Sequence, residues 1–187
     1  EDIPWSETGG VPKHMFKGRD EIIDQFTKHY LGRNRLETYV LYGMTRHGKT
    51  SIHKYLAKAL MASSPMEVAQ HGKLKYVTFQ WDFGEAVNQS KNTKELWYYL
   101  IKDCIIDTID EYIDNDIIDE RLLNDNTYKK LSQKHENGYR AADLKRILSL
   151  LNSYGYMAFI AIDEFTYYTE MIDKELISPA FLATIRK

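Results

Sequence analysis

The chain has 187 residues, of which 43% are hydrophobic, and a formal net charge of −2 at pH 7. This size suits one domain with its own core, and the near-neutral balance gives no overall electrostatic footprint for nucleic acid, although it leaves room for a local basic patch. The single Cys104 excludes an internal disulfide. Because neither a secretory signal nor a long apolar run occurs, we expect a cytoplasmic protein without a membrane span.

The N-terminal residues, 1–14, contain prolines and a Gly-Gly pair, and we interpret them as an irregular lead-in or linker. Apolar residues at helical spacing then predict a helix from Asp20 to Tyr30, with Phe16 and Arg19 just ahead of it. From the residues alone, Phe16 is explained as a hydrophobic staple of this helix and Arg19 as a surface ion-pair partner.

The next motif is a loop between a predicted strand, 39–42, and a helix predicted from about Lys49 to the Ser-Ser-Pro stop at 63–65. Its sequence, GMTRHGKT, fits the Walker A pattern G-x-x-x-x-G-K-[ST], whose backbone N–H groups and following helix cradle phosphate. We expect Lys49 to reach the β- and γ-phosphates and the Thr50 hydroxyl to bind Mg²⁺. A chance glycine-containing turn is the alternative. The residues predicted to contact nucleotide here are Gly43, Met44, Thr45, Arg46, His47, Gly48, Lys49, Thr50 and Ser51.

The middle of the chain supplies a strand and a long helix. Alternating apolar and aromatic residues predict a strand over 74–83, and we interpret Asp82 near its end as a structural carboxylate in preference to a functional one. An amphipathic helix is predicted over 93–113, with Cys104 as a buried, inert thiol. The acidic segment 107–125 is interpreted as a solvated face, because it lacks the order of carboxylates that a Ca²⁺ loop requires.

A second motif follows a helix predicted over 140–153, which Gly155 is expected to cap. The apolar run 156–162 predicts a buried strand, and it ends in Asp163-Glu164, a Walker B pattern with an acidic pair. We expect Asp163 to hold Mg²⁺ and Glu164 to polarise the water that attacks the γ-phosphate. Two structural carboxylates with a basic partner are the alternative.

These features together resemble the P-loop ATPases that carry an additional catalytic glutamate, the group that includes AAA+ proteins and STAND signalling ATPases. The segment 15–23, MFKGRDEII, also resembles the entry segment of STAND and origin-recognition-type ATPases. The resemblance implies an α/β fold for residues 15–187, a parallel, doubly wound P-loop sandwich that is incomplete at its C-terminus. It further implies that Phe16 packs on the adenine and that Arg19 holds this segment or contacts phosphate.

The implied activity is Mg²⁺-dependent hydrolysis of ATP to ADP, slow in this segment because the sensor and arginine-bearing parts of such ATPases would follow it. Arg46 and His47 are the only nearby candidate cations within the segment. Two roles remain open. One is a STAND-type switch in signalling or antiviral defence, in which ATP controls self-association. The other is a DNA-handling ATPase similar to origin-recognition or helicase-loader proteins. A nucleotide-binding scaffold without useful hydrolysis is a third possibility.

Overall fold

The computed structural model describes residues 21, 49–62, 66–68, 72–135 and 138–186. The chain divides into two compact units, residues 1–78 and 79–187. Glu21 is helical, as predicted, but the rest of the predicted helix 20–30, the lead-in and the strand 39–42 lie outside the described residues.

The described residues of the N-terminal unit form a helix and the start of a sheet. α2 covers Lys49–Met61 and buries Ile52, Leu56 and Leu60, because a four-residue spacing places these side chains on one helix face. The helix therefore begins where the sequence predicts, directly after the glycine of the loop. Two strands follow, β1 over Met66–Val68 and β2 over Gly72–Asp82. The predicted strand over 74–83 is thus confirmed, except that Phe83 belongs to the next helix.

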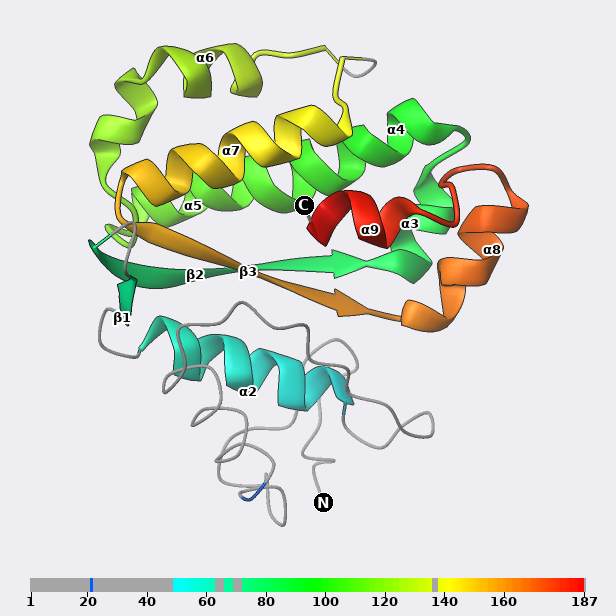
Figure 1. Ribbon diagram of the computed structural model, residues 1–187, viewed down its shortest axis with the longest axis horizontal. Helices are drawn as coiled ribbons and strands as arrows, with labels where there is room; N and C mark the ends of the chain where they lie inside the picture. Colours follow the sequence, from blue (N-terminus) through cyan, green and yellow to red (C-terminus); the bar gives the residue numbers. More distant parts are fainter. Residues whose placement is uncertain (1–20, 22–48, 63–65, 69–71, 136–137, 187) are drawn as a thin grey trace, which may run out of the picture. The chain divides into compact units, whose positions relative to one another are not determined.

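The strands form a mixed sheet in the order β1-β2-β3, where β3 covers Tyr156–Asp163. β1 pairs antiparallel with β2, with Met66 opposite Leu74 and Val68 opposite Gly72. β2 and β3 point the same way, as the arrows in Figure 1 show. The parallel arrangement is therefore confirmed for β2 and β3. β1 departs from it, because its connection to β2 is too short for the crossover that parallel neighbours require.

A continuous helical run follows in the unit 79–187. It consists of α4 (Thr93–Tyr98), a π-helix (Tyr99–Ile106) and α5 (Asp107–Asp114), so the helix predicted over 93–113 is confirmed. The π-helical centre is not apparent from the sequence. The Trp81 indole N–H, on β2, donates to the Leu100 carbonyl oxygen at 3.0 Å and so ties this stretch to the sheet.

The apolar face of this run forms much of the core. Cys104 lies half-buried on it, and burial raises the pKa of its thiol to about 12. The thiol is therefore protonated at neutral pH, which agrees with the predicted inert cysteine. Thr108 and Tyr112 are also half-buried. The completely buried side chains of the run are Leu96, Leu100, Ile101, Ile105, Ile106 and Ile109.

The acidic segment after α5 forms two short helices that the sequence analysis does not predict, a 3-10 helix over Glu120–Asn124 and α6 over Asn126–Ser132. Asp119 accepts a hydrogen bond from the Arg121 N–H at 2.9 Å. Asp125 accepts one from the Thr127 N–H at 2.7 Å. Both carboxylates cap a helix N-terminus, where unpaired N–H groups favour negative charge. The interpretation of the acidic segment as a solvated face is therefore incomplete for Asp119 and Asp125, which cap helices.

α7 covers Ala141–Ser153, contacts β3 and delivers the chain into it, as predicted. Gly155 connects the two elements with φ 87°, a conformation that suits glycine, and its N–H donates to the Asn152 carbonyl oxygen at 3.0 Å. On β3 itself, Met157 and Ala161 are buried, but several neighbours are only half-buried. The strand is therefore less enclosed than the apolar run suggests.

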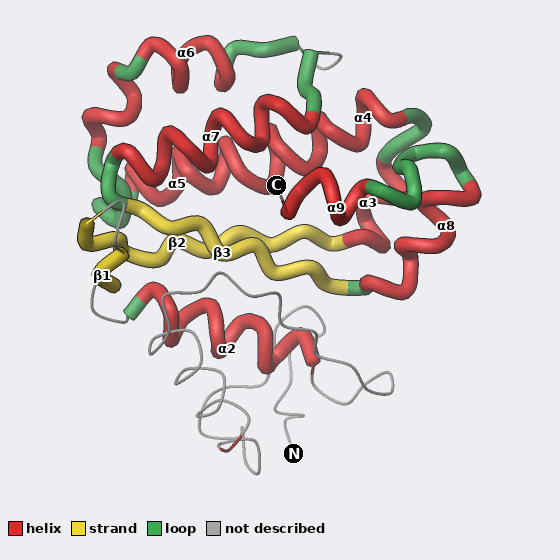
Figure 2. The backbone as a smooth tube through the Cα atoms, viewed as in Figure 1, coloured by secondary structure: helices red, strands yellow, loops and turns green. Residues whose placement is uncertain are grey.

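After β3 the chain forms a 3-10 helix (Phe165–Tyr167), α8 (Tyr168–Asp173) and α9 (Phe181–Arg186). α9 anchors Phe181 in the core, where its ring centroid lies 5.3 Å from that of Trp97. Figure 2 shows how much of the unit 79–187 is helical. Within the described ranges, no helix has the length and apolar character that crossing a membrane requires.

Candidate functional site

The carboxyl ends of β2 and β3 lie at one edge of the sheet, where the two arrowheads in Figure 1 end. β2 ends in Asp82 and continues into α3 (Phe83–Gln89). β3 ends in Asp163 and continues into the 3-10 helix, which contacts α3. Ligands of open α/β sheets bind outside the carboxyl ends of parallel strands, so this edge is the candidate site.

Asp163 is the last residue of β3 and is buried, with 7% of its surface exposed. Its Oδ1 accepts a hydrogen bond from the backbone N–H of Glu164 at 2.9 Å. The bond fixes the direction of the carboxylate at the strand end. A carboxylate held in this way is suited to binding a cation at the sheet edge.

Glu164 has a left-handed backbone, with φ 51° and ψ 40°, and its side chain is exposed. For a residue with a β-carbon this conformation costs about 1–2 kcal/mol, so the surrounding structure must hold it. Strained backbone of this kind is concentrated at functional sites. The Glu164 carbonyl oxygen accepts the Tyr167 N–H at 3.0 Å, which closes the 3-10 turn that follows.

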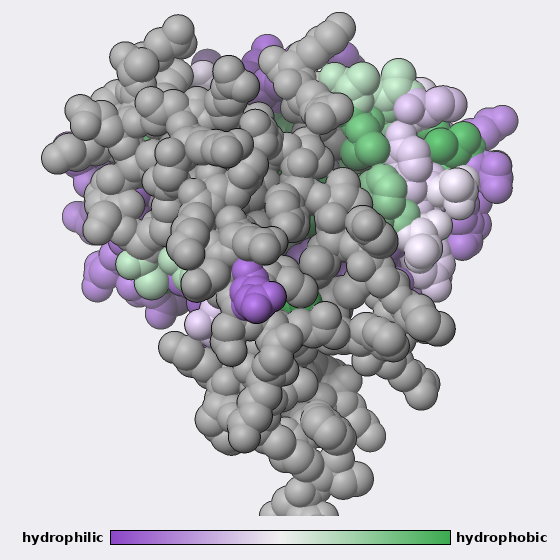
Figure 3. Space-filling model, turned by 60° about the horizontal axis from the view of Figure 1, so that its bottom comes forward, coloured by the Kyte–Doolittle hydropathy of each residue, from purple (hydrophilic) through white to green (hydrophobic). Residues whose placement is uncertain are grey.

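Three aromatic rings hold that turn against α3. Phe165 stacks on Tyr168, with ring centroids 5.2 Å apart and planes 7° apart. Both also stack on Phe83, whose ring centroid lies 6.0 Å from that of Phe165 and 6.4 Å from that of Tyr168. Each such pair contributes about 0.5–1.5 kcal/mol beyond its buried area, so the three contacts together can offset the cost of about 1–2 kcal/mol of the Glu164 backbone conformation. Phe83 is completely buried, whereas Phe165 is 46% exposed. Figure 3 shows hydrophobic side chains interspersed with hydrophilic ones on the part of the described surface that it displays.

Asp82 has the structural role expected of it. Its Oδ1 accepts the Glu85 N–H at 2.9 Å and so caps the N-terminus of α3. The sequence carries a signal for this helix, an aspartate followed three residues later by a glutamate. At Gly84, a β-carbon would lie 3.2 Å from Asp82 Oδ1 and 3.3 Å from the Tyr167 ring, so the glycine leaves room for the capping carboxylate and for the ring.

The phosphate-binding residues predicted from the sequence are described only in part. Lys49, Thr50 and Ser51 form the first turn of α2, as predicted, and only their backbone is described. The N–H groups of a first helical turn have no partner within the helix and favour an anion. The remaining predicted contacts, Gly43, Met44, Thr45, Arg46, His47, Gly48, Phe16 and Arg19, lie outside the described residues.

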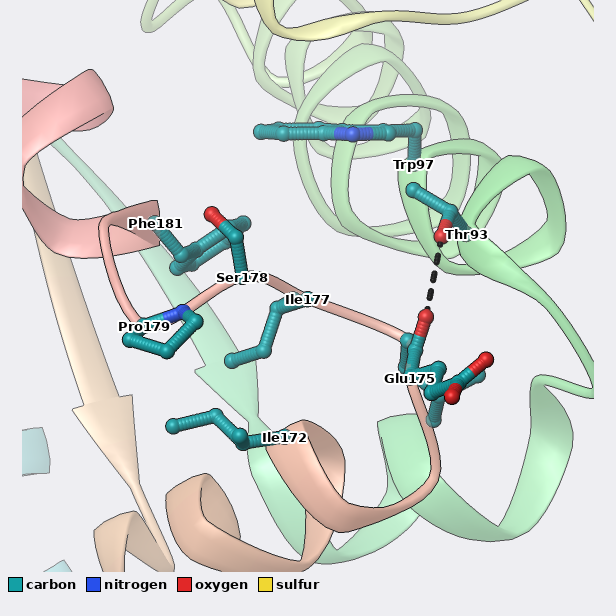
Figure 4. Close-up of a pocket in the computed structure, with 9 residues that line it drawn as sticks. Thr93, Trp97, Ile172, Glu175, Ile177, Ser178, Pro179 and Phe181 are labelled. Atoms are coloured by element: carbon teal, nitrogen blue, oxygen red, sulfur yellow. Dashed lines mark hydrogen bonds between the residues drawn. The ribbon is translucent and has the colours of Figure 1, made fainter.

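A cavity of about 540 Å³ occurs elsewhere in the unit 79–187, between α4 and the segment 172–181. Its walls are mainly apolar, and Figure 4 shows Trp97 and Ile177 on opposite sides of it. The Thr93 hydroxyl donates to the Glu175 carbonyl oxygen at 3.3 Å across one end. The apolar Trp97, Ile177 and Phe181 in its lining are buried, whereas the lining Thr93, Glu175, Ser178 and Pro179 are exposed.

Mg²⁺ is the metal that the sequence resemblance implies, and Asp163 fits it. A carboxylate oxygen is the kind of ligand that this hard cation prefers, and Mg²⁺ sites commonly combine one or two carboxylates with water and substrate phosphate. No protein-family model matches the chain, and no curated protein or solved structure is significantly similar to it. The motif residues and the geometry at the end of β3 are therefore the grounds for assigning a function.

Proposed function

We propose that this chain binds ATP with Mg²⁺ and hydrolyses it to ADP and phosphate, within a P-loop fold. The observation that carries the proposal is the order of two elements. A G-x-x-x-x-G-K-T loop runs directly into α2, and β3 ends in a buried Asp163 followed by an exposed Glu164. A strand that ends in an acidic pair is the partner that a phosphate-binding loop requires.

Each residue has a distinct role in this proposal. The first turn of α2 and the Lys49 ammonium hold the β- and γ-phosphates. Thr50 and Asp163 hold Mg²⁺, which neutralises charge on the phosphates when it is bound. Glu164 orients and polarises the attacking water, and its exposed carboxylate leaves room for that water.

We further propose that nucleotide acts as a switch of the STAND type, with ATP controlling self-association. Electrostatic stabilisation is strongest where bulk water is excluded, and Glu164 is exposed. Its exposure therefore supports a site that becomes complete only when another subunit covers it. The net charge of −2 gives no support to the alternative role in handling DNA.

Thermal unfolding with and without MgATP tests the binding step. At a ligand concentration about a hundredfold above its dissociation constant, linkage predicts a gain of about 2.7 kcal/mol in the free energy of unfolding. Lys49→Ala should abolish most of this gain. Lys58→Ala is the matched control, because it removes the same charge from the exposed last turn of the same helix. A wild-type protein that gains no stability from millimolar MgATP would contradict the proposal.

Hydrolysis is tested separately with Glu164→Gln. Glutamine keeps the shape of the side chain but loses the charge that polarises water, so this variant should bind MgATP normally and hydrolyse it poorly. Wild-type turnover in this variant would show that Glu164 is not the base.

A further inference from the structure

We propose that Phe165 is a positioning residue for Glu164, and that its stacking on Phe83 and Tyr168 keeps the Glu164 backbone in the conformation that hydrolysis uses. The inference rests on the proposed ATPase function. It assigns a role to an aromatic residue that the motif does not include.

The backbone of Glu164 is strained by its left-handed conformation. A backbone with φ 51° costs a glutamate about 1–2 kcal/mol, so contacts of the residues on both sides must offset that cost. On one side is β3, whose last residue, Asp163, accepts the Glu164 N–H. On the other side is the 3-10 turn, whose first residue is Phe165.

The second step is the attachment of that turn. Phe165 and Tyr168 stack almost parallel to each other, and both rest on the completely buried Phe83. Buried side chains in a well-packed interior have little freedom to move, so Phe83 is a fixed support. Phe165, the residue directly after Glu164, is therefore attached through its ring to the interior of the unit.

The third step is the anchoring of α3 itself. Asp82 caps the helix, and the Tyr99 hydroxyl donates to the Glu85 carboxylate at 3.1 Å from the π-helix. Gly84 leaves the space that the Tyr167 ring fills. The position of Glu164 is thus linked to the ends of two strands, and a small shift of the turn would move the carboxylate away from its water. Displacements of about 1 Å at a reacting group can reduce rates by about a hundredfold.

The test compares single-turnover hydrolysis and ATP affinity in full-length protein variants. Phe165→Leu removes the ring but keeps an apolar side chain, and Phe165→Tyr keeps the ring. Tyr98→Leu is the control, because it breaks another aromatic pair of the same unit, Tyr98–Tyr139 at 5.7 Å. Phe165→Leu should lower the hydrolysis rate constant about tenfold, with the dissociation constant for MgATP changed by less than about twofold. Phe165→Tyr and Tyr98→Leu should stay within about twofold of wild type in both.

A second variant covers the case in which Phe165→Leu unfolds at the assay temperature. Gly84→Ala places a methyl group 3.2 Å from the Asp82 Oδ1 that caps α3 and 3.3 Å from the Tyr167 ring, so it should displace the turn and lower the hydrolysis rate several-fold without weakening binding. A wild-type rate in a folded Phe165→Leu or, failing that, Gly84→Ala variant would overturn the positioning role. The positioning role would also be overturned if Tyr98→Leu lowered the hydrolysis rate as much as Phe165→Leu does. The same holds if Phe165→Leu lowered ATP affinity in parallel with the hydrolysis rate. A wild-type protein that binds no ATP would instead overturn the proposed function itself.

Discussion

The carboxylate of Asp163 accepts a hydrogen bond from the backbone N–H of Glu164 at 2.9 Å, so the two acidic residues at the end of β3 are coupled through the main chain. One residue is buried and the other exposed. The coupling means that a change of the proposed metal ligand also disturbs the proposed base. Substitutions at Asp163 must therefore separate loss of charge from loss of the hydrogen bond.

Asp163→Asn and Asp163→Ala make that separation. Asparagine keeps an oxygen that accepts the Glu164 N–H, so the free energy of unfolding should stay near wild type, whereas alanine should lower it by about 1–2 kcal/mol. Both should weaken Mg²⁺-dependent ATP binding about tenfold or more, because both remove the charge that holds the metal. Calorimetric titration with and without Mg²⁺ measures the affinity, and urea unfolding measures stability. Undiminished Mg²⁺-dependent binding by Asp163→Asn would argue against Asp163 as a metal ligand.

Glu164→Gly should stabilise the protein while abolishing hydrolysis. Glycine adopts a left-handed backbone without steric cost, and the gain is expected to be about 0.5–1 kcal/mol after allowing for the flexibility of glycine in the unfolded chain. Glu175→Gly is a matched control, since Glu175 is also an exposed glutamate with φ 57°. It should gain similar stability and keep wild-type hydrolysis. If Glu164→Gly were less stable than wild type, the backbone there would not be strained.

The elements that the sequence predicts well are those whose burial repeats at a regular period. β2 buries the consecutive Tyr76, Val77, Thr78 and Phe79 and alternates only at its end, where Gln80 is exposed and Trp81 buried, whereas α7 buries Leu144, Ile147 and Leu151 at helical spacing. Local pattern is sufficient for such elements, because packing against one neighbour sets the period.

The features that the sequence does not predict depend on contacts between distant residues. The π-helix around Leu100 is supported by a hydrogen bond from Trp81, and the turn after Glu164 is supported by Phe83. Neither contact leaves a periodic signal. The left-handed backbone of Glu164 opposes the local propensity of glutamate, so no local sequence pattern predicts it. The N-terminus of α3, in contrast, has a local sequence signal, because Asp82 and Glu85 have the spacing of a helix cap.

Cys104 should react slowly with iodoacetamide in the folded protein. Burial raises its pKa from 9.0 to about 12, so at pH 8 only about one thiol in ten thousand is ionised. Labelling at pH 8 should be at least about tenfold faster in urea than in buffer. Because the folded pKa lies above the unfolded one, the associated stability is complete below about pH 9 and is lost as pH rises toward 12. Equal labelling rates in urea and buffer would contradict the raised pKa of the half-buried thiol.

The last prediction concerns how the site is completed. In the proposed site, Lys49, Thr50 and Asp163 would hold the phosphates and the metal and Glu164 the water, but charge that develops on the γ-phosphate would require a further cation. Such a cation, supplied by another subunit or domain, can raise the rate about 10³- to 10⁵-fold. If a neighbouring subunit supplies it, turnover per molecule of the full-length protein should increase with protein concentration across the range in which the protein assembles. Steady-state hydrolysis, measured alongside light scattering over that range, tests this.

Arg46, in the phosphate-binding loop, is the alternative source of the cation within the same chain. Under the assembly model, Arg46→Ala should change the single-turnover rate of the assembled protein by less than about tenfold, because the stabilising charge comes from elsewhere. Turnover that is independent of concentration, combined with loss of most activity in Arg46→Ala, would place the cation in cis. The proposed switch would then be wrong, since a complete site in each monomer would hydrolyse ATP before assembly.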